Sequence, residues 1–296
     1  MTETIQTKYG AFDVDMTRDQ KMGRMLQSGS YPNEYILAVA KLFVSPQSVV
    51  ADIGSHIGTC AVPLGGMGAT VFAFEPVGET CALLRTNAAR SGTNITVRNM
   101  ALGRAAGTAA LVRRTASNAG ADSLVSGGDI QVSTLDHELE RADFIKIDVE
   151  GMEGEVLAGG TGLIERSRPV VFFEVNLSQL RAHGTSPRAL GHFFRSRDYN
   201  LYLPVVTRAG GITFGRVEAL GLIAAVIAPR AWLLHSDSPP FDIVAVPEDK
   251  CGALTAAGFT SGLWWAIGHN MRDKIRRLRK HLSYVSMPSW NRASAV

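Results

Sequence analysis

Two apolar runs flank a glycine-containing turn in Val49-Val-Ala-Asp52-Ile-Gly54-Ser-His-Ile-Gly58 and Thr70-Val-Phe-Ala-Phe-Glu75-Pro76. Both runs are short and rich in valine and phenylalanine, which is typical of buried strands, and each ends near an acidic residue. Gly54 allows a tight turn out of the first strand, and Gly58 removes a side chain where the next helix approaches. Glu75 follows the second strand, where a carboxylate can accept both hydroxyls of a ribose. The pattern predicts an α/β domain that binds a nucleoside-containing ligand.

The spacing of the glycines distinguishes between classes of nucleotide ligand. Dinucleotide sites have the pattern Gly-x-Gly-x-x-Gly, whereas the positions two and five after Gly54 are His56 and Thr59. A carboxylate at Asp52 would repel a pyrophosphate but can pair with the ammonium group of a methionine moiety. The charge pattern therefore favours S-adenosylmethionine as the cofactor. Taken alone, the short motif is also typical of a helix cap.

A third segment, Asp143-Phe-Ile-Lys146-Ile-Asp148-Val-Glu150-Gly151, has charges inside an apolar run. Lys146 and Asp148 have the same parity and should point to one face of a strand, a costly placement unless they serve a site or a buried ion pair. Because ligands bind at the carboxyl ends of such strands, we predict that Asp148 and Glu150 act as a base or orient the acceptor. Lys146 is the third predicted catalytic residue, with neutralisation of these carboxylates as its favoured role.

The next predicted strand ends at Glu174 and Asn176, which add oxygen ligands beside this segment. We expect both to bind substrate hydroxyls. No metal site is predicted, and a Mg²⁺ ion held by Asp148, Glu174 and Asn176 is the alternative.

These motifs resemble the FkbM family of S-adenosylmethionine-dependent methyltransferases. The matching segments are Asp52-x-Gly54-x-x-x-Gly58, Phe74-Glu75-Pro76, Ala101-Leu102-Gly103 and Phe144-Ile-Lys-Ile-Asp-Val-Glu-Gly151, within a resemblance from about Tyr31 to Pro247. Many relatives have Ala-Asn where this chain has Ser55-His56, so the turn differs there. The resemblance implies a Rossmann-like class I methyltransferase fold, with a mostly parallel seven-stranded sheet, helices on both faces and an antiparallel strand at one edge.

The resemblance also implies a donor site, an acceptor site and a reaction. The predicted cofactor contacts are Asp52, Gly54, Ser55, His56, Gly58, Glu75, Pro76, Asn99, Ala101, Leu102, Ser123 and Asp148. The predicted substrate contacts are Tyr31, Glu150, Glu174 and Asn176. The expected reaction is methyl transfer to a hydroxyl of a sugar, a glycolipid or a polyketide-type natural product. The alternatives are a nicotinamide-dependent oxidoreductase on a similar sheet and a non-catalytic interaction protein with the cofactor fold.

The chain of 296 residues is interpreted as one enzyme domain with two extensions. We expect a helical extension over residues 1–48, a methyltransferase domain over 49–247 with an insertion at about 207–240, and a basic helical tail over 248–296. The tail is expected to pack on the domain or on a second subunit, with weak contact to a membrane surface as the alternative.

Composition bounds the partners and the location of the chain. A net charge of +3 does not call for a nucleic-acid partner. The apolar segment 220–229 has about half the length that a bilayer requires. Three cysteines without metal-type spacing and an N-terminus without an apolar stretch favour the cytoplasm.

Overall fold

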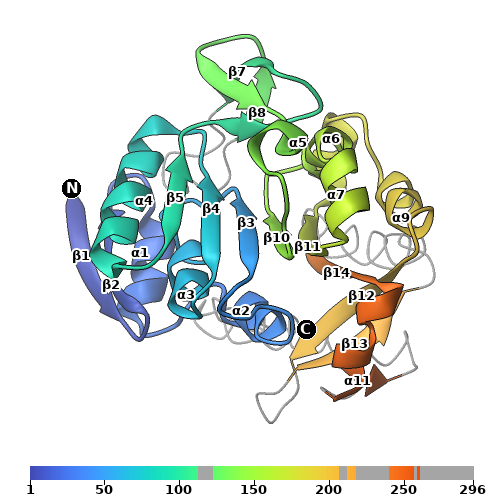
Figure 1. Cartoon of the computed structure of the whole chain (residues 1–296). Coiled ribbons are helices and arrows are strands. Elements are labelled where there is room, and N and C mark those ends of the chain that lie inside the picture. Colours follow the sequence, from blue (N-terminus) through green and yellow to red (C-terminus); the bar gives the residue numbers. More distant parts are fainter. Residues whose placement is uncertain (113–122, 207–211, 218–239, 257–258, 261–296) are drawn as a thin grey trace, which may run out of the picture.

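The computed structural model in Figure 1 describes residues 1–112, 123–206, 212–217, 240–256 and 259–260. These residues form a central nine-stranded sheet, a four-stranded sheet and a two-stranded sheet. The order of the central sheet is β15 (Phe259–Thr260), β13 (Ile212–Arg216), β12 (Tyr199–Val206), β14 (Phe241–Pro247), β11 (Val170–Val175), β10 (Phe144–Ile147), β3 (Val49–Ile53), β4 (Thr70–Phe74) and β5 (Ile95–Arg98).

The strand order confirms the Rossmann-like class I methyltransferase fold. It differs from the prediction in the position of the antiparallel strand and in the number of strands. Strands β5, β4, β3, β10 and β11 are parallel, as the buried apolar runs predict. The expected antiparallel strand is β14, which lies between β11 and β12 instead of at the edge. Two further strands, β13 and β15, extend the sheet beyond β12. The seven-strand prediction missed them because β13 falls within the expected insertion and β15 has only two residues.

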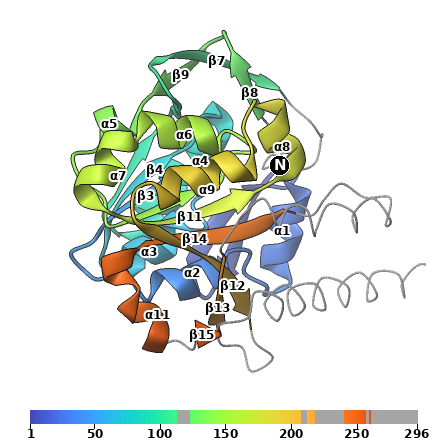
Figure 2. The ribbon, with the colours of Figure 1, turned by 90° about the vertical axis from the view of Figure 1, so that its right-hand side faces the viewer.

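Helices cover both faces of the central sheet, as predicted (Figures 1 and 2). On one face, α2 (Glu34–Ala40), α3 (Ala61–Gly66) and α4 (Gly78–Ser91) pack on side chains such as Val50, Val71 and Phe144. On the other face, α6 (Glu153–Gly159), α7 (Thr161–Ser167), α8 (Leu177–Ala182) and α9 (Pro187–Arg195) pack on Ile145 and Ile147. Alternate residues of β10 thus enter opposite cores, which places Lys146 on the same face as Phe144.

The N-terminal segment is a hairpin followed by a helix, so the expected all-helical extension over residues 1–48 is wrong for its first part. Strands β1 (Thr2–Thr7) and β2 (Gly10–Asp15) pair antiparallel and precede α1 (Gln20–Gln27). The hairpin is fixed to α4, where the backbone N–H of Asp13 donates to Asn87 Oδ1 at 2.8 Å and Arg90 Nη2 lies 2.8 Å from Asp13 Oδ2. Alternating polar and apolar residues in this hairpin bury Phe12 and Val14 fully.

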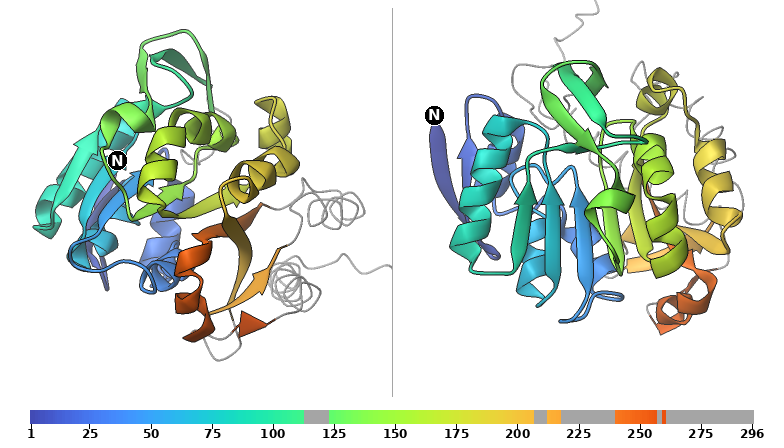
Figure 3. Two further views of the ribbon diagram at one scale, coloured as in Figure 1. Left: turned by 45° about the vertical axis from the view of Figure 1, so that its right-hand side comes forward. Right: turned by 45° about the horizontal axis from the view of Figure 1, so that its top comes forward.

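A four-stranded sheet stands at the carboxyl ends of β3, β4 and β5 (Figures 1 and 3). Its strands, in the order β6 (Ala101–Leu102), β9 (Ile130–Ser133), β7 (Gly107–Val112) and β8 (Ser123–Ser126), follow β5 along the chain. Within this sheet, β7 pairs antiparallel with both β8 and β9. Residues 113–122, between β7 and β8, lie outside the described residues.

The C-terminal part is described only up to Thr260. It contains a 3-10 turn, η2 (Glu248–Lys250), and the short helix α11 (Gly252–Ala256). The apolar segment 220–229 and the basic tail from residue 261 onward lie outside the described residues. Within the described part, every helix is too short or too polar to cross a bilayer.

Two glycines in helices provide a matched test of the packing. A Cβ on Gly159, the last residue of α6, would overlap the backbone carbonyl oxygen of Gly103, whereas a Cβ on Gly66 in α3 meets no atom within 4 Å. We expect Gly159→Ala to lower the free energy of unfolding by about 1–3 kcal/mol through overpacking. Gly66→Ala should leave it unchanged or raise it by up to about 1 kcal/mol. Urea unfolding measures both, and equal effects would contradict the packing of α6 on Gly103.

Candidate active site

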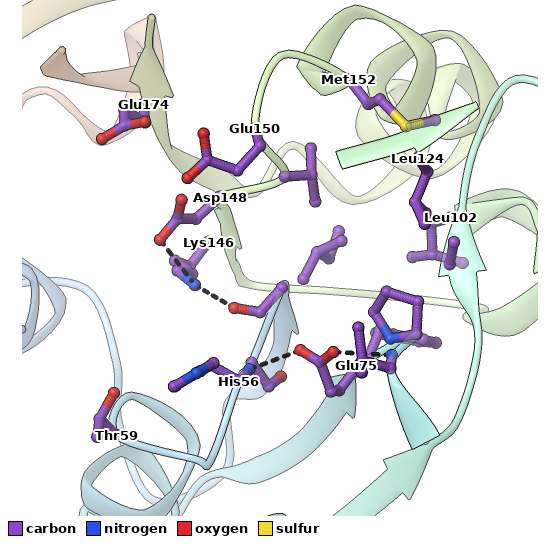
Figure 4. Close-up of a pocket in the computed structure, with 18 of the residues that line it drawn as sticks. His56, Thr59, Glu75, Leu102, Leu124, Lys146, Asp148, Glu150, Met152 and Glu174 are labelled. Carbon is purple, nitrogen blue, oxygen red and sulfur yellow. Dashed lines mark hydrogen bonds and ion pairs between the residues drawn. The ribbon is translucent and has the colours of Figure 1, made fainter. Parts of the chain in front are cut away.

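A cavity of about 360 Å³ opens at the carboxyl ends of β3, β4, β10 and β11 (Figure 4). Its volume lies within the range of small-molecule sites. The segments that follow β3, β4 and β10 line it together with Glu174 of β11 and residues of α1, β6, β7 and β8. Figure 4 shows an acidic end with Asp148, Glu150 and Glu174 and an apolar end with Leu102, Leu124 and Met152. His56 and Glu75 lie between the two ends.

The turn after β3 forms one wall of the cavity, as predicted. Gly54 has a φ of +76°, and a Cβ there would overlap the carbonyl oxygen of Asp148, so this position requires glycine. The backbone N–H groups of Gly54 and Ser55 both donate to the carbonyl oxygen of Phe74 at 3.0 Å. Gly54, Ser55 and His56 line the cavity, whereas Gly58 packs behind the turn against Leu84.

Glu75 lies at the centre of the cavity wall with a side chain that is almost fully buried. Its Oε2 accepts from the backbone N–H of His56 at 3.0 Å and its Oε1 from that of Val77 at 2.9 Å. Burial raises the pKa of Glu75 above its ordinary value, and the charge of His56 and these two hydrogen bonds oppose that shift. Each carboxylate oxygen keeps a second lone pair. The carboxylate can therefore accept two hydroxyl groups from a ligand, as predicted for a ribose.

Lys146 connects β10 with β3 beneath the cavity. Its Nζ donates to the carbonyl oxygen of Gly54 at 2.7 Å and lies 3.3 Å from Asp52 Oδ1 and 3.4 Å from Asp148 Oδ2. Burial alone would lower the pKa of Lys146, but the carboxylates of Asp52 and Asp148 outweigh burial and raise it well above its ordinary value. Lys146 is therefore a fixed cation, in agreement with the neutralising role predicted for it.

Asp52 differs from its predicted role. Its side chain is 0% exposed, lies directly opposite Lys146 in the register of β3 and β10, and is not among the residues that line the cavity. The expectation that Asp52 pairs with the ammonium group of a ligand is thus corrected, because its charge is already balanced by Lys146. At the acidic end, the carboxyl groups that face the cavity belong to Asp148, Glu150 and Glu174.

The acidic end brings together residues from two neighbouring strands. The Asp148 side chain is 42% exposed, and Glu150 has a positive φ of 50° and accepts from Gln179 Nε2 at 3.2 Å. Burial, followed by the charges of Asp148 and Asp242, raises the pKa of Glu174 to about 9. The acidic end therefore combines Glu174, whose pKa is raised, with the partly exposed side chain of Asp148.

The apolar end includes Ala101 and Leu102, which the resemblance assigns to the cofactor site. Pro76, Val77, Met100, Ala101 and Leu102 line it from the predicted segments. Sequence reasoning missed three more lining residues, Leu111 of β7, Leu124 of β8 and Met152. Leu111 and Leu124 belong to the small sheet at the carboxyl ends of the central strands, so their place in the cavity depends on the tertiary fold and not on a local sequence signal.

Besides Asp52 and Gly58, four predicted site residues, Tyr31, Asn99, Ser123 and Asn176, are not among the residues that line the cavity. Tyr31 is a core residue, because its hydroxyl donates to the carbonyl oxygen of Thr59 at 2.9 Å and its ring packs edge-on against Tyr9. Asn99 is exposed, and its Nδ2 donates to the backbone oxygens of Glu75 at 2.9 Å and Pro76 at 3.1 Å. It therefore supports the segment that carries Glu75. Ser123 begins β8, and its side chain lies outside the described atoms.

Asn176 caps α8 instead of lining the cavity. Its Oδ1 accepts from Ser178 Oγ at 2.9 Å and from the backbone N–H of Gln179 at 3.4 Å. The magnesium alternative thereby loses one of its three ligands. Within the described residues, histidine, cysteine, aspartate and glutamate form no group of three or more in a metal-binding arrangement.

The N-terminal segment contributes a wall that the sequence did not predict. Lys21, Met22 and Met25 of α1 line the cavity. Asp19 caps α1 through a hydrogen bond from the backbone N–H of Met22 at 3.3 Å, and its Oδ2 lies 3.0 Å from His56 Nε2. Asp19 before an amphipathic helix is a recognisable cap signal, but its contact with His56 depends on the tertiary fold.

Comparison with known proteins identifies a matching domain. Residues 52–201, about half of the chain, match the model of the methyltransferase FkbM domain. No curated protein matches the chain.

Three solved structures illustrate the similarity. The methyltransferase FkbM from Methylobacillus flagellatus is 21% identical, with a TM-score of 0.37 over 54% of this chain and 40% of that chain. The precorrin-6y C5,15-methyltransferase from Geobacter metallireducens is 15% identical, with a TM-score of 0.40 over 72% of this chain and 87% of that chain. The magnesium protoporphyrin IX methyltransferase from Synechocystis, with bound SAH, is 13% identical, with a TM-score of 0.38 over 72% and 78% of the two chains. This chain thus spans less than half of the first of these structures.

Glu153 at the start of α6 gives a pH-dependent prediction. Its side chain is 1% exposed, and burial raises its pKa from 4.5 to about 7, although its Oε1 accepts from the backbone N–H of Gly151 at 3.2 Å. The folded state binds this proton more tightly than the unfolded state. The stabilisation of the folded state by the protonated Glu153 side chain is therefore complete below about pH 4.5, and it is lost as the pH rises to about 7.

We expect Glu153→Gln to remove this loss of stability. The free energy of unfolding of the variant should therefore exceed that of the wild type by a difference that grows to about 3 kcal/mol between about pH 5 and about pH 8. Urea unfolding at both pH values measures the difference. Glu155→Gln on the same helix is the control, since that side chain is partly exposed and pairs with Arg104. A gain that is equal at both pH values would show that Glu153 is ionised throughout.

Proposed function

Because this chain belongs to the FkbM family of methyltransferases, we propose that it transfers a methyl group from S-adenosylmethionine to a hydroxyl of a sugar, a glycolipid or a polyketide-type natural product. The observation that carries the proposal is the Glu75 carboxylate. It is held by two backbone N–H groups midway between the apolar and the acidic ends of one cavity. Such an arrangement supports a ligand with a ring, a ribose and an amino acid in that order.

The residues of the cavity fit S-adenosylmethionine. Glu75 is available to the ribose hydroxyls, and the apolar side chains of Pro76, Leu102 and Leu124 form a surface for the adenine. The opposite end offers carboxylates to the ammonium group of the methionine, and here Asp148 takes the place first expected for Asp52. Gly54 keeps the wall between them free of a side chain.

When bound, the cofactor supplies a methyl group activated by the positive sulfur. The task of the protein is then to place the acceptor oxygen in line with that methyl group. Asp148 is held by Lys146 and partly exposed, so it can take the acceptor proton as the new bond forms. Glu150, oriented by Gln179, is the second candidate for this role or for holding a neighbouring hydroxyl.

The proposed partner is a small-molecule or glycan acceptor, and no nucleic-acid partner is proposed. The contacts expected of the basic tail, with a second subunit or with a membrane surface, stay predictions, because residues 261–296 lie outside the described part. The cytoplasmic location also stays a prediction.

We expect Glu75→Gln to weaken binding of S-adenosylmethionine and S-adenosylhomocysteine by about tenfold or more, since the amide has only one oxygen to replace two acceptors. Isothermal titration calorimetry measures the affinity, and circular dichroism verifies folding. Glu155→Gln, outside the cavity, is the control and should bind as the wild type does. Unchanged affinity in a folded Glu75→Gln variant, or binding of NAD alone by the wild type, would contradict the proposal.

We expect Asp148→Asn to slow methyl transfer by about 100-fold at saturating donor, because a proton acceptor is lost, and also to weaken donor affinity, because a carboxylate facing the ammonium group of the methionine is lost. The measurement uses a labelled methyl donor with cell extract, fractionated into glycolipid, small-molecule and macromolecular pools. Glu150→Gln, assayed in parallel on the pool that the wild type labels, shows which carboxylate takes the proton. If both single variants keep full activity, neither Asp148 nor Glu150 is by itself the required base.

A further inference from the structure

Two carboxyl groups face each other across strands β11 and β14 at the acidic end of the cavity. Glu174 and Asp242 are directly opposite partners in the antiparallel register, and Glu174 lines the cavity. Side chains in such positions leave the same face of the sheet about 5 Å apart at their Cβ atoms. Like charges in this arrangement repel, and carboxylates that share a site commonly hold one proton between them.

Tyr35 of α2 distinguishes the two carboxyl groups. Its hydroxyl donates to Asp242 Oδ2 at 2.9 Å, and its ring packs on Phe172, one of the largest fully buried side chains. Burial, reinforced by the charge of Asp242, raises the pKa of Tyr35 well above its ordinary value. The phenol therefore remains protonated and is a permanent donor to Asp242. A donor favours the ionised form of its partner, so this hydrogen bond favours a negative charge on Asp242 over one on Glu174.

Three other carboxylates near Glu174 also raise its pKa. Asp148 and Glu150 approach it from the segment after β10, and Glu153 from the start of α6. These three residues of the described part are acidic, and the nearby cation Lys146 is bound to Asp52, Asp148 and the Gly54 carbonyl oxygen. Burial and these charges together account for the raised pKa of Glu174.

We propose that Glu174 and Asp242 hold one proton in total, that this proton resides on Glu174, and that the single O–H of the neutral Glu174 carboxyl group donates a hydrogen bond to an oxygen of the methyl acceptor, while Asp242 accepts from Tyr35. The inference rests on the proposed function for the identity of the cavity. Asp242 and Tyr35 are positioning residues in this scheme, because they act through Glu174.

The proposal narrows the class of acceptor. A neutral donor at Glu174 lies beside proton acceptors at Asp148 and Glu150 (Figure 4). This combination matches two neighbouring oxygens, of which one accepts a hydrogen bond and the other, a hydroxyl, gives up its proton. A vicinal diol of a sugar or a hydroxy ketone has this pattern. An acceptor with a carboxylate or phosphate next to the methylated oxygen would be repelled by the same end of the cavity.

The protonation state of Glu174 is measurable without any acceptor. Infrared spectroscopy of the full chain in heavy water records the C=O band of protonated carboxyl groups as the pH is raised. We expect a band that disappears near pH 9 in the wild type and is absent in Glu174→Gln. Glu153→Gln is the matched control and should remove only a band that disappears near pH 7. Asp242→Asn should move the Glu174 band to lower pH, because it removes the facing charge.

Three results would overturn this placement of the proton. They are a Glu174 band that disappears at the ordinary pH of a glutamate, a band that Asp242→Asn leaves unmoved, and loss of the band when magnesium is added to the wild type. The Asp242→Asn arm stands on its own if Glu174→Gln does not fold. The infrared measurements do not depend on binding of S-adenosylmethionine. Calorimetry with S-adenosylmethionine therefore tests the proposed function independently of the protonation of Glu174.

The donor role of Glu174 has its own test on the pool that the wild type methylates. Glu174→Gln keeps a neutral donor and should retain the rate within about threefold, whereas Glu174→Ala should lose about tenfold or more. If the glutamine variant is as slow as the alanine variant, Glu174 acts in its ionised form and the proposal fails.

Discussion

The ion pair between Lys146 and Asp52 is the contact on which the site depends. It lies between neighbouring strands of the sheet, and the same ammonium group also holds the Gly54 carbonyl oxygen and Asp148. One cation thereby fixes the two segments that follow β3 and β10, which form opposite sides of the cavity. Removal of one partner from a fully buried ion pair lowers the free energy of unfolding by about 3–5 kcal/mol, because the remaining charge is buried without water or its counter-ion. Geometry of the site and stability of the sheet are therefore linked through one side chain.

The local sequence predicted those features whose cause is local. Strands β3, β4, β10 and β11 follow from short apolar runs, and the end of α4 follows from Gly92, which has a φ of 65°. Strands β12 and β14 also consist of short, mainly apolar runs, which lie on either side of the expected insertion and pair antiparallel. Glu75 and the Gly54 turn line the cavity, and both positions follow from a backbone turn and a strand end, which the spacing of the sequence reveals.

What the sequence could not predict depends on register and on packing between distant segments. Parity placed Lys146 and Asp148 on one face, but the pairing of Lys146 with Asp52 requires the register of β10 against β3. Tyr31 was expected near the acceptor and instead packs in the core, since its neighbour Tyr9 belongs to a hairpin that was not predicted. Asn176 had a competing use as a helix cap, a role that asparagine at the end of a strand often takes.

The wall formed by α1 has a consequence for where this protein can be divided. The matched domain begins at Asp52, yet the cavity is closed on one side by Met22 and Met25, and His56 in the glycine turn touches Asp19. A recombinant fragment trimmed to the domain boundaries would expose that side to solvent and leave an imidazole without its carboxylate. The unit that forms the chamber is thus larger than the unit that family comparison delimits.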